Sequence, residues 1–185
     1  MLLNNVELKF TAIDKPNDDG KYQTAFFVNN SKDENALIKL IDDCWENDKG
    51  QFNKAPKSLA YKEYNNPEDP NDKHNGKTVF NASQNAESAD GKYQFKVDVY
   101  DSSANLIDKD KVPSIGWGTI ANINVTTYCW TFKKDKGVKL NLEAVQIIDL
   151  VEYGGANPFE PSEGGYKAPT NPFTQPTEKQ QDIGV

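Results

Sequence analysis

The stretch "TTYCWTFKKDKGVKLNLEAVQ", residues 126–146, contains two alternating segments separated by a lysine-rich turn. Because successive side chains of a strand point to opposite faces, Tyr128, Trp130 and Phe132 share one face of the first segment. Apolar residues alternate with polar ones in the second segment as well. The turn ends in Gly137, which can take the positive φ of a hairpin with a bulge. The stretch therefore predicts a β-hairpin.

The aromatic row of this hairpin has two interpretations. One is that the rings belong to the core of a sheet. The other is that they form a platform for stacking, with Lys133, Lys134 and Lys136 as a charged rim. Bases stack on aromatic faces whatever their identity, and lysines contact phosphates without reading sequence. The strand register decides between the two, and the alternation alone leaves both open.

The composition limits the kinds of function. The chain has 185 residues and a net charge of -7, and all of its 21 basic residues are lysine. Without arginine it lacks the commonest specific contact to guanine, so nucleic-acid binding would carry little sequence preference. No run approaches the roughly 18 apolar residues of a membrane helix, and the N-terminus does not read as a secretory signal. We expect no contact with a membrane.

The two cysteines, Cys44 and Cys129, do not make a disulfide framework. Each stands among apolar neighbours, so we expect two small buried hydrophobic side chains. A reducing cytoplasm is the expected compartment.

The hydrophobic pattern predicts six or seven short strands and one helix, without internal repeats. In the first strand Val6, Leu8 and Phe10 should face the core, opposite Glu7, Lys9 and Thr11. The helix should begin at a capping box on Ser31 and end near Asp48. Further expected strands cover 21–29, 78–83 and 91–101. This order favours a small antiparallel barrel or sandwich over a parallel doubly wound sheet.

Two polar regions separate or follow these elements. Residues 51–77 read as a long surface loop, in which Tyr61 and Tyr64 alternate with Lys57 and Lys62 as a possible aromatic and basic contact surface. Trp117, between two glycines, should be exposed. From residue 154 onward the composition shifts to Gly, Pro, Asn and Gln, which predicts a flexible tail.

The residues for most catalytic sites are missing from the sequence. His74 is the only histidine and is expected to be exposed in the polar loop. Three Cys and His residues, far apart in the chain, are too few for a zinc site. We expect no cofactor and no bound metal. One enzymatic alternative remains, a magnesium-dependent nuclease built on four aspartates, Asp98, Asp101, Asp108 and Asp110.

Three motifs in order resemble the bacteriophage single-stranded DNA-binding proteins with an OB-fold. They are "VDVYDSSANLI" (97–107), "IGWGTIANINV" (115–125) and "KGVKLNLEAVQIIDLVEY" (136–153). The second matches the family at Gly116, Gly118 and Thr119. The third, the most specific, matches at Gly137, Val138, Leu140, Leu142, Val145, Gln146, Leu150 and Val151. The resemblance implies a mainly β, OB-fold-like antiparallel five-stranded barrel over residues 1–153, with one helix, added loops and a flexible tail over 154–185.

The resemblance also implies a function without catalysis. Such proteins coat and protect single-stranded DNA in phage replication, recombination and repair, in the cytoplasm of the infected bacterium, as monomers or homodimers. The expected DNA-binding residues are Lys57, Tyr61, Lys62, Trp117, Tyr128, Trp130, Phe132, Lys133, Lys134 and Lys136. The tail implies docking of replication or recombination proteins, with Phe159 and Phe173 as anchors. A β-rich structural or interaction module of a virion or host complex is the alternative.

Overall fold

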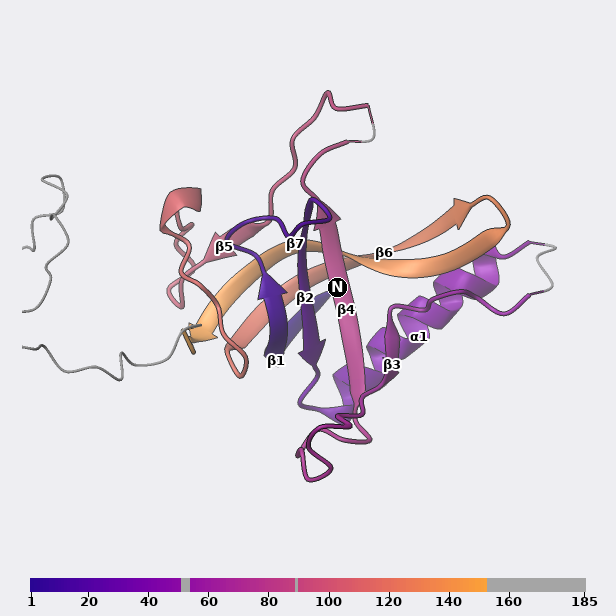
Figure 1. Cartoon of the computed structure of the whole chain (residues 1–185), viewed down its shortest axis with the longest axis horizontal. Coiled ribbons are helices and arrows are strands. Elements are labelled where there is room, and N and C mark those ends of the chain that lie inside the picture. The colour runs from indigo at the N-terminus through magenta and orange to yellow at the C-terminus, as the bar shows by residue number, and fades with distance from the viewer. Residues whose placement is uncertain (51–53, 89, 153–185) are drawn as a thin grey trace, which may run out of the picture. The chain divides into compact units, whose positions relative to one another are not determined.

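The computed structural model describes residues 1–50, 54–88 and 90–152 (Figure 1). The predicted boundary at residue 153 and the tail that follows it lie outside this part of the chain. The strands are β1 (Leu2–Ala12), β2 (Lys21–Phe27), β3 (Tyr61–Glu63), β4 (Thr78–Asn85), β5 (Asp98–Tyr100), β6 (Ile120–Phe132) and β7 (Asp135–Asp149). The helices are α1 (Ser31–Asp48) and the short 3-10 helix η1 (Lys109–Lys111).

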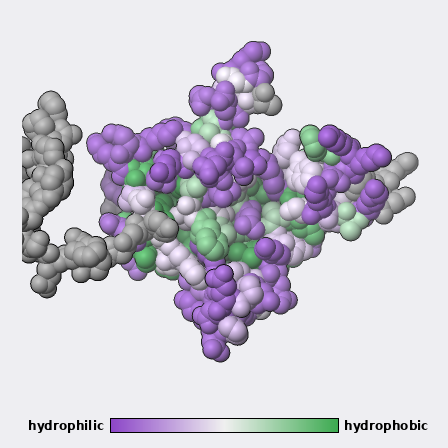
Figure 2. All heavy atoms as spheres, viewed as in Figure 1, coloured by the Kyte–Doolittle hydropathy of each residue, from purple (hydrophilic) through white to green (hydrophobic). Residues whose placement is uncertain are grey.

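Five of the strands close into a barrel. The sheet runs in the order β3-β4-β2-β1-β6-β7-β5, and a further pairing of β4 with β7 closes the five strands from β4 to β7 into a ring, with β3 and β5 outside it. This closing contact, between Ala82 and Leu140, is parallel, whereas the other pairs among the five barrel strands are antiparallel. The predicted OB-fold-like barrel of β1, β2, β4, β6 and β7 is therefore confirmed. In Figure 2 apolar residues gather over the middle of the visible face, whereas the projecting loops are hydrophilic.

The β6–β7 hairpin is present, but its turn is shorter than predicted. Trp130 pairs with Gly137 and Phe132 with Asp135, which leaves a two-residue turn in which Lys133 has a φ of 54°. Gly137 lies within β7 and its φ is not positive, so the expected bulge there is wrong. The absence of a side chain at Gly137 allows close packing instead. A Cβ on Gly137 would lie 2.7 Å from both the Trp130 ring and the Ser58 carbonyl oxygen.

The register of the hairpin places the aromatic row outside the barrel. Ile123 and Val125 of β6 are buried in the core, as are Leu140 and Leu142 of β7. Tyr128 lies on the opposite face of β6, where its side chain is exposed to solvent. Of the two interpretations of the aromatic row, the core interpretation is therefore wrong for the row as a whole.

Helix α1 packs its apolar stripe against the barrel, as its spacing predicts. Leu37, Ile41 and Trp45 are buried along one side. The cap differs from the prediction: the Asn30 side chain accepts a hydrogen bond of 2.8 Å from the Asp33 N–H, so the predicted cap, Ser31, is the first helical residue. Asn30 can cap because its short side chain reaches the N–H of a residue in the first turn, which has no partner within the helix.

A disulfide joins Cys44 of α1 to Cys129 of β6, which corrects the expectation of two separate thiols. The pairing could not be predicted from the sequence, because the two cysteines are 85 residues apart and only the packing of the helix on β6 brings them together.

Strand β1 breaks the predicted alternation at a bulge. The register with β2 shifts between Lys9 and Ala12, and Phe10 adopts a left-handed φ of 49°. Phe10, predicted to face the core, is consequently 68% exposed, whereas Lys9 keeps its predicted outer face and is buried there under the rings of Tyr64 and Trp117. A bulge adds a residue to one strand and turns the following side chains, which a two-residue period cannot anticipate.

Two further segments differ from the sequence prediction. The region 51–77 contains β3, and its later part packs on the barrel and buries His74, which was expected to be exposed. The predicted strand 91–101 is reduced to β5. Tyr93 and Phe95 are exposed in the loop before it, and only Val97 and Val99 of the expected apolar face are buried.

Candidate nucleic-acid interface

The outer face of the hairpin presents two open aromatic rings beside lysines. Tyr128 is 52% exposed and Phe132 is 63% exposed. The Lys133 ammonium lies 5.2 Å from the centre of the Phe132 ring, and the Lys139 ammonium lies 5.4 Å from the centre of the Tyr128 ring. Flat apolar surfaces and positive charge thus alternate along one side of the hairpin.

Trp130 stands between these two rings in the sequence but has a different environment. Its side chain is half-buried, and its ring lies against the backbone of Gly137 on the neighbouring strand. The ring therefore fills space within the hairpin and offers less free surface than Tyr128 or Phe132.

The predicted lysines at the hairpin divide into two pairs. Lys133 and Lys134 are exposed in the turn, and no ion pair engages either of them within the described ranges. Lys57 forms an ion pair of 2.7 Å with Asp135, and Lys136 donates to the Asp48 carbonyl at 3.2 Å. Lys57 and Lys136 thus fasten the hairpin to the segment before β3 and to the end of α1, which lies beside it in Figure 1.

Tyr61 and Lys62 in β3 lie apart from this face. The Tyr61 hydroxyl donates to Asp42 of α1 at 3.0 Å, and its ring packs on Phe80, with ring centres 6.0 Å apart. Burial first, and then the Asp42 carboxylate, raises the pKa of Tyr61. Tyr61 therefore connects β3 to the helix, whereas Lys62 is exposed.

Trp117 belongs to a second cluster, on the outer face of β1. Its ring is 43% exposed, as predicted, and covers the buried Lys9 ammonium at 3.5 Å from the ring centre. The same ammonium lies 3.8 Å from the centre of the Tyr64 ring and donates to the Tyr64 hydroxyl. Burial lowers the pKa of Lys9, against the attraction of Asp72 and Glu7.

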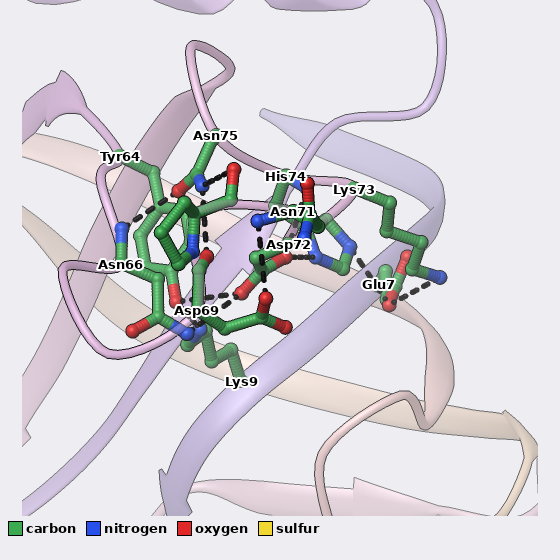
Figure 3. Close-up of polar contacts among 11 residues, drawn as sticks. Glu7, Lys9, Tyr64, Asn66, Asp69, Asn71, Asp72, Lys73, His74 and Asn75 are labelled. Carbon is green, nitrogen blue, oxygen red and sulfur yellow. Dashed lines mark hydrogen bonds and ion pairs between the residues drawn. The ribbon is translucent and has the colours of Figure 1, made fainter.

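His74 fastens the loop 64–77 to the barrel (Figure 3). Its Nδ1 lies 2.9 Å from Asp72 and its Nε2 lies 3.1 Å from Glu7, while its ring stacks on Phe27 with centres 4.4 Å apart. The polar sequence of this loop indicated that His74 is exposed. No local sequence pattern indicates its contact with Glu7, because Glu7 lies far away in the chain.

The two carboxylates of this cluster have lowered pKa values. Burial raises the pKa of Glu7, but hydrogen bonds and charge attraction to His74 and Lys73 outweigh burial and leave it below its ordinary value. The pKa of Asp72 lies well below its ordinary range, chiefly because the His74 backbone N–H donates to it. Asn66, His74 and Tyr64 add side-chain hydrogen bonds that outweigh desolvation.

Three of the four aspartates considered for a nuclease have separate roles. Asp98 pairs with Lys96 at 3.0 Å and Asp108 with Lys111 at 2.7 Å, whereas Asp101 accepts hydrogen bonds inside its own turn. No group of three or more His, Cys, Asp or Glu side chains within the described residues is arranged to hold a metal ion. The geometry therefore does not favour the nuclease alternative.

The helices in the described part of the chain include none long and apolar enough to cross a membrane.

Phe95 and Lys139 were not predicted as site residues, yet both lie beside Tyr128 in one hollow. The predicted hairpin could have indicated Lys139, because Lys139 pairs directly with Tyr128. No sequence pattern could have indicated Phe95, because its loop reaches this face only through the tertiary fold.

Several solved structures share this fold. The single-stranded DNA-binding protein from bacteriophage Enc34 aligns over 86% of each chain, with a TM-score of 0.58 and 20% identity. The gp2.5 single-stranded DNA-binding protein of bacteriophage T7 aligns over 88% of this chain and 97% of its own, with a TM-score of 0.58 and 16% identity. The Enc34 protein in complex with single-stranded DNA gives a TM-score of 0.60 and 19% identity, over 83% and 88% of the chains.

Comparison of the sequence alone gives no match, either to a family model or to a curated protein. At identities of 16–20% the structural likeness establishes a common fold.

Proposed function

We propose that this protein binds single-stranded DNA with little preference for base sequence. The observation that carries the proposal is the outer face of the β6–β7 hairpin, where the exposed rings of Tyr128 and Phe132 stand beside free lysines. Unpaired bases offer their faces for stacking, and a base stacked on an aromatic side chain contributes about 1–3 kcal/mol. Bases in a duplex are already stacked on one another, so single strands should be favoured.

The direct contacts in this proposal are a subset of the residues expected from the sequence. Tyr128 and Phe132 stack bases, and Lys133 and Lys134 contact phosphates. Trp130, Lys57, Lys136 and Tyr61 hold the shape of this region, because their side chains are committed to internal contacts. Trp117 and Lys62 are exposed elsewhere and are available to a strand that extends beyond the hairpin.

The mode of action is binding and not catalysis. Coating of exposed single strands would protect them during phage DNA replication and recombination in the cytoplasm of an infected bacterium. The fold is shared with phage proteins whose names state that they bind single-stranded DNA, and one of these was solved with the DNA bound. The alternative of a purely structural β-rich module leaves the free lysines beside open rings without a role.

The tail is proposed to dock a replication or recombination protein. Phe159 and Phe173 each end an Asn-Pro-Phe tripeptide and would serve as anchors. Both residues lie outside the described part of the chain, so this proposal rests on the sequence.

A titration with labelled oligonucleotides tests the proposed function. Oligothymidylate, oligodeoxycytidylate, a mixed sequence and a duplex of equal length are compared at one salt concentration. The three single strands should bind with similar affinity and the duplex at least about tenfold more weakly, a difference of 1.4 kcal/mol. Equal affinity for duplex and single strands would contradict the proposal.

A further inference from the structure

A hollow lies at the seam where β4 meets β7 to close the barrel. Its volume is about 360 Å³, and its lining includes Gln84, Asn85, Phe95, Tyr128, Lys139 and Asn141. We call it the seam hollow. The volume falls in the range of about 300–1,000 Å³ of small-molecule sites, so it can hold a group the size of one nucleotide.

The seam hollow contains a positive charge without a carboxylate partner. Lys139 is half-buried, and no ion pair joins its ammonium to a carboxylate in the described residues. Glu87 also lines the hollow, but its carboxylate turns toward the backbone of Gly91, whose Cβ position would be 2.9 Å away. A partly desolvated cation that no internal anion neutralises is a site for an external anion.

A second lysine strengthens this preference for an anion. Lys21 of β2 is the register partner of Asn85, which lines the hollow. Burial, and then the charge of Lys21, lowers the pKa of Lys139. Two like charges held near each other repel, and a phosphate between them would turn this repulsion into attraction for both.

Two aromatic rings reach the same hollow from different elements. Tyr128 comes from β6 and is half exposed, and Phe95 comes from the loop between β4 and β5 and is 40% exposed. Exposed rings of this size on a closed barrel leave apolar surface in water, which a stacked base would cover.

Three amide side chains line the hollow with unused hydrogen-bonding capacity. In the described residues no side-chain hydrogen bond engages the amides of Gln84, Asn85 or Asn141. An amide offers both donors and an acceptor, so it can pair with the edge of a base in more than one way.

We propose that the seam hollow is a subsite for one nucleotide of a bound single strand. The phosphate binds between Lys139 and Lys21, the base stacks on Tyr128 and Phe95, and the amides contact the base edge. This inference rests on the proposed function and adds to it a fixed anchoring point away from the hairpin turn. It also assigns a contact with the ligand to Lys139, Lys21 and Phe95, which are not among the DNA-binding residues expected from the sequence.

The test compares Lys139→Met with Lys32→Met in the full chain. Lys32 is exposed at the start of α1, which contributes no residue to the lining of the seam hollow, so its variant removes the same charge outside the hollow. With fluorescein-labelled oligothymidylate, Lys139→Met should bind about three- to tenfold more weakly than the wild type. The salt dependence should flatten by roughly 0.7 in the log–log slope, the value of one lost phosphate contact. Phe95→Ala should lower affinity without changing the slope, and Lys32→Met should change neither quantity.

A chemical footprint on the wild-type protein makes the test independent of variant folding. Acetylation of each lysine by acetic anhydride is measured by mass spectrometry with and without saturating oligothymidylate. Lys139 should be protected and Lys32 should not. Equal acetylation of Lys139 in both states, or a Lys139→Met variant that binds like Lys32→Met, overturns the subsite. If single strands still bind better than duplex in that case, the proposed function survives. Wild-type protein that shows no such preference overturns both proposals.

Discussion

Tyr128 and Trp130 lie two residues apart on one strand face, yet their surroundings differ. The alternation of β6 makes them equivalent, since it specifies a face and nothing more. The structure separates them through a single neighbour: Trp130 stands opposite Gly137, and the missing side chain admits its ring. Tyr128 stands opposite Lys139 and stays open to solvent.

The two residues should therefore respond differently to truncation. Tyr128→Ala should weaken binding of oligothymidylate by about 1–3 kcal/mol and leave the melting temperature almost unchanged, because a stacking surface is lost and no packing. Trp130→Ala should lower the free energy of unfolding by about 2–4 kcal/mol, slightly less than for a fully buried ring. Fluorescence titration and urea unfolding of both variants measure these effects. A stable Trp130→Ala protein with strongly reduced DNA affinity would show that Trp130 is the stacking residue.

At the scale of elements, the hydrophobic pattern left a barrel and a sandwich open, and the resemblance to phage single-stranded DNA-binding proteins implied the barrel. Regular periodicity predicted the hairpin and helix α1. These elements follow local rules: a two-residue period, an apolar helical stripe and turn residues at the ends. The burial of Lys9 does not follow them, because the rings that cover its ammonium belong to Tyr64 and Trp117, far away in the chain. The Cys44–Cys129 disulfide and the buried His74 were missed for the same reason.

At low pH the loop 64–77 should detach from the barrel. Glu7 and Asp72 have folded-state pKa values below their unfolded values of about 4, so their contribution to stability is present above that pH. It is lost as the pH falls through the lower folded-state values, when each carboxylate takes up a proton and its bonds to His74 weaken. Trp117 borders this loop, so its fluorescence should change below about pH 4.

A matched pair of variants checks this assignment. Asp72→Asn should be less stable at pH 7 and should lose less stability between pH 6 and pH 3 than the wild type. Lys73→Ala removes only the ion pair between Glu7 and the exposed ammonium of Lys73, and should change stability by at most about 1 kcal/mol. An Asp72→Asn protein with the acid sensitivity of the wild type would place the titrating groups elsewhere.

At the scale of the whole molecule, the tail from residue 154 onward should be dispensable for folding. It carries four acidic and two basic residues, a net charge of -2, so it should compete only weakly with DNA for the lysines. Deleting residues 154–185 should leave the melting temperature nearly unchanged and raise DNA affinity by less than about tenfold, or 1.4 kcal/mol. A large fall in the melting temperature would show that the folded domain needs the tail and that the boundary is misplaced.

The net charge of -7 determines how a strand can be held. An acidic protein cannot attract DNA over its whole surface, and screening at physiological salt confines each charge to about 8 Å. Affinity must therefore come from a few local lysines together with stacking, which depends little on salt. We expect about two to five phosphate contacts, each contributing roughly 0.7 to the log–log dependence of affinity on salt concentration.

The double variant Lys133→Ala, Lys134→Ala should flatten this slope by about 1–1.4, because each lysine of the hairpin turn contributes one contact. The matched control removes two lysines of α1, Lys32 and Lys39, which changes the net charge equally but leaves the hairpin intact. Titrations with oligothymidylate between 50 and 300 mM salt (about two- to threefold steps) give both slopes. If the control flattened the slope as much as the hairpin variant, net charge and not a local phosphate track would govern binding. If neither variant changed it, the phosphates would follow a path that avoids the hairpin turn.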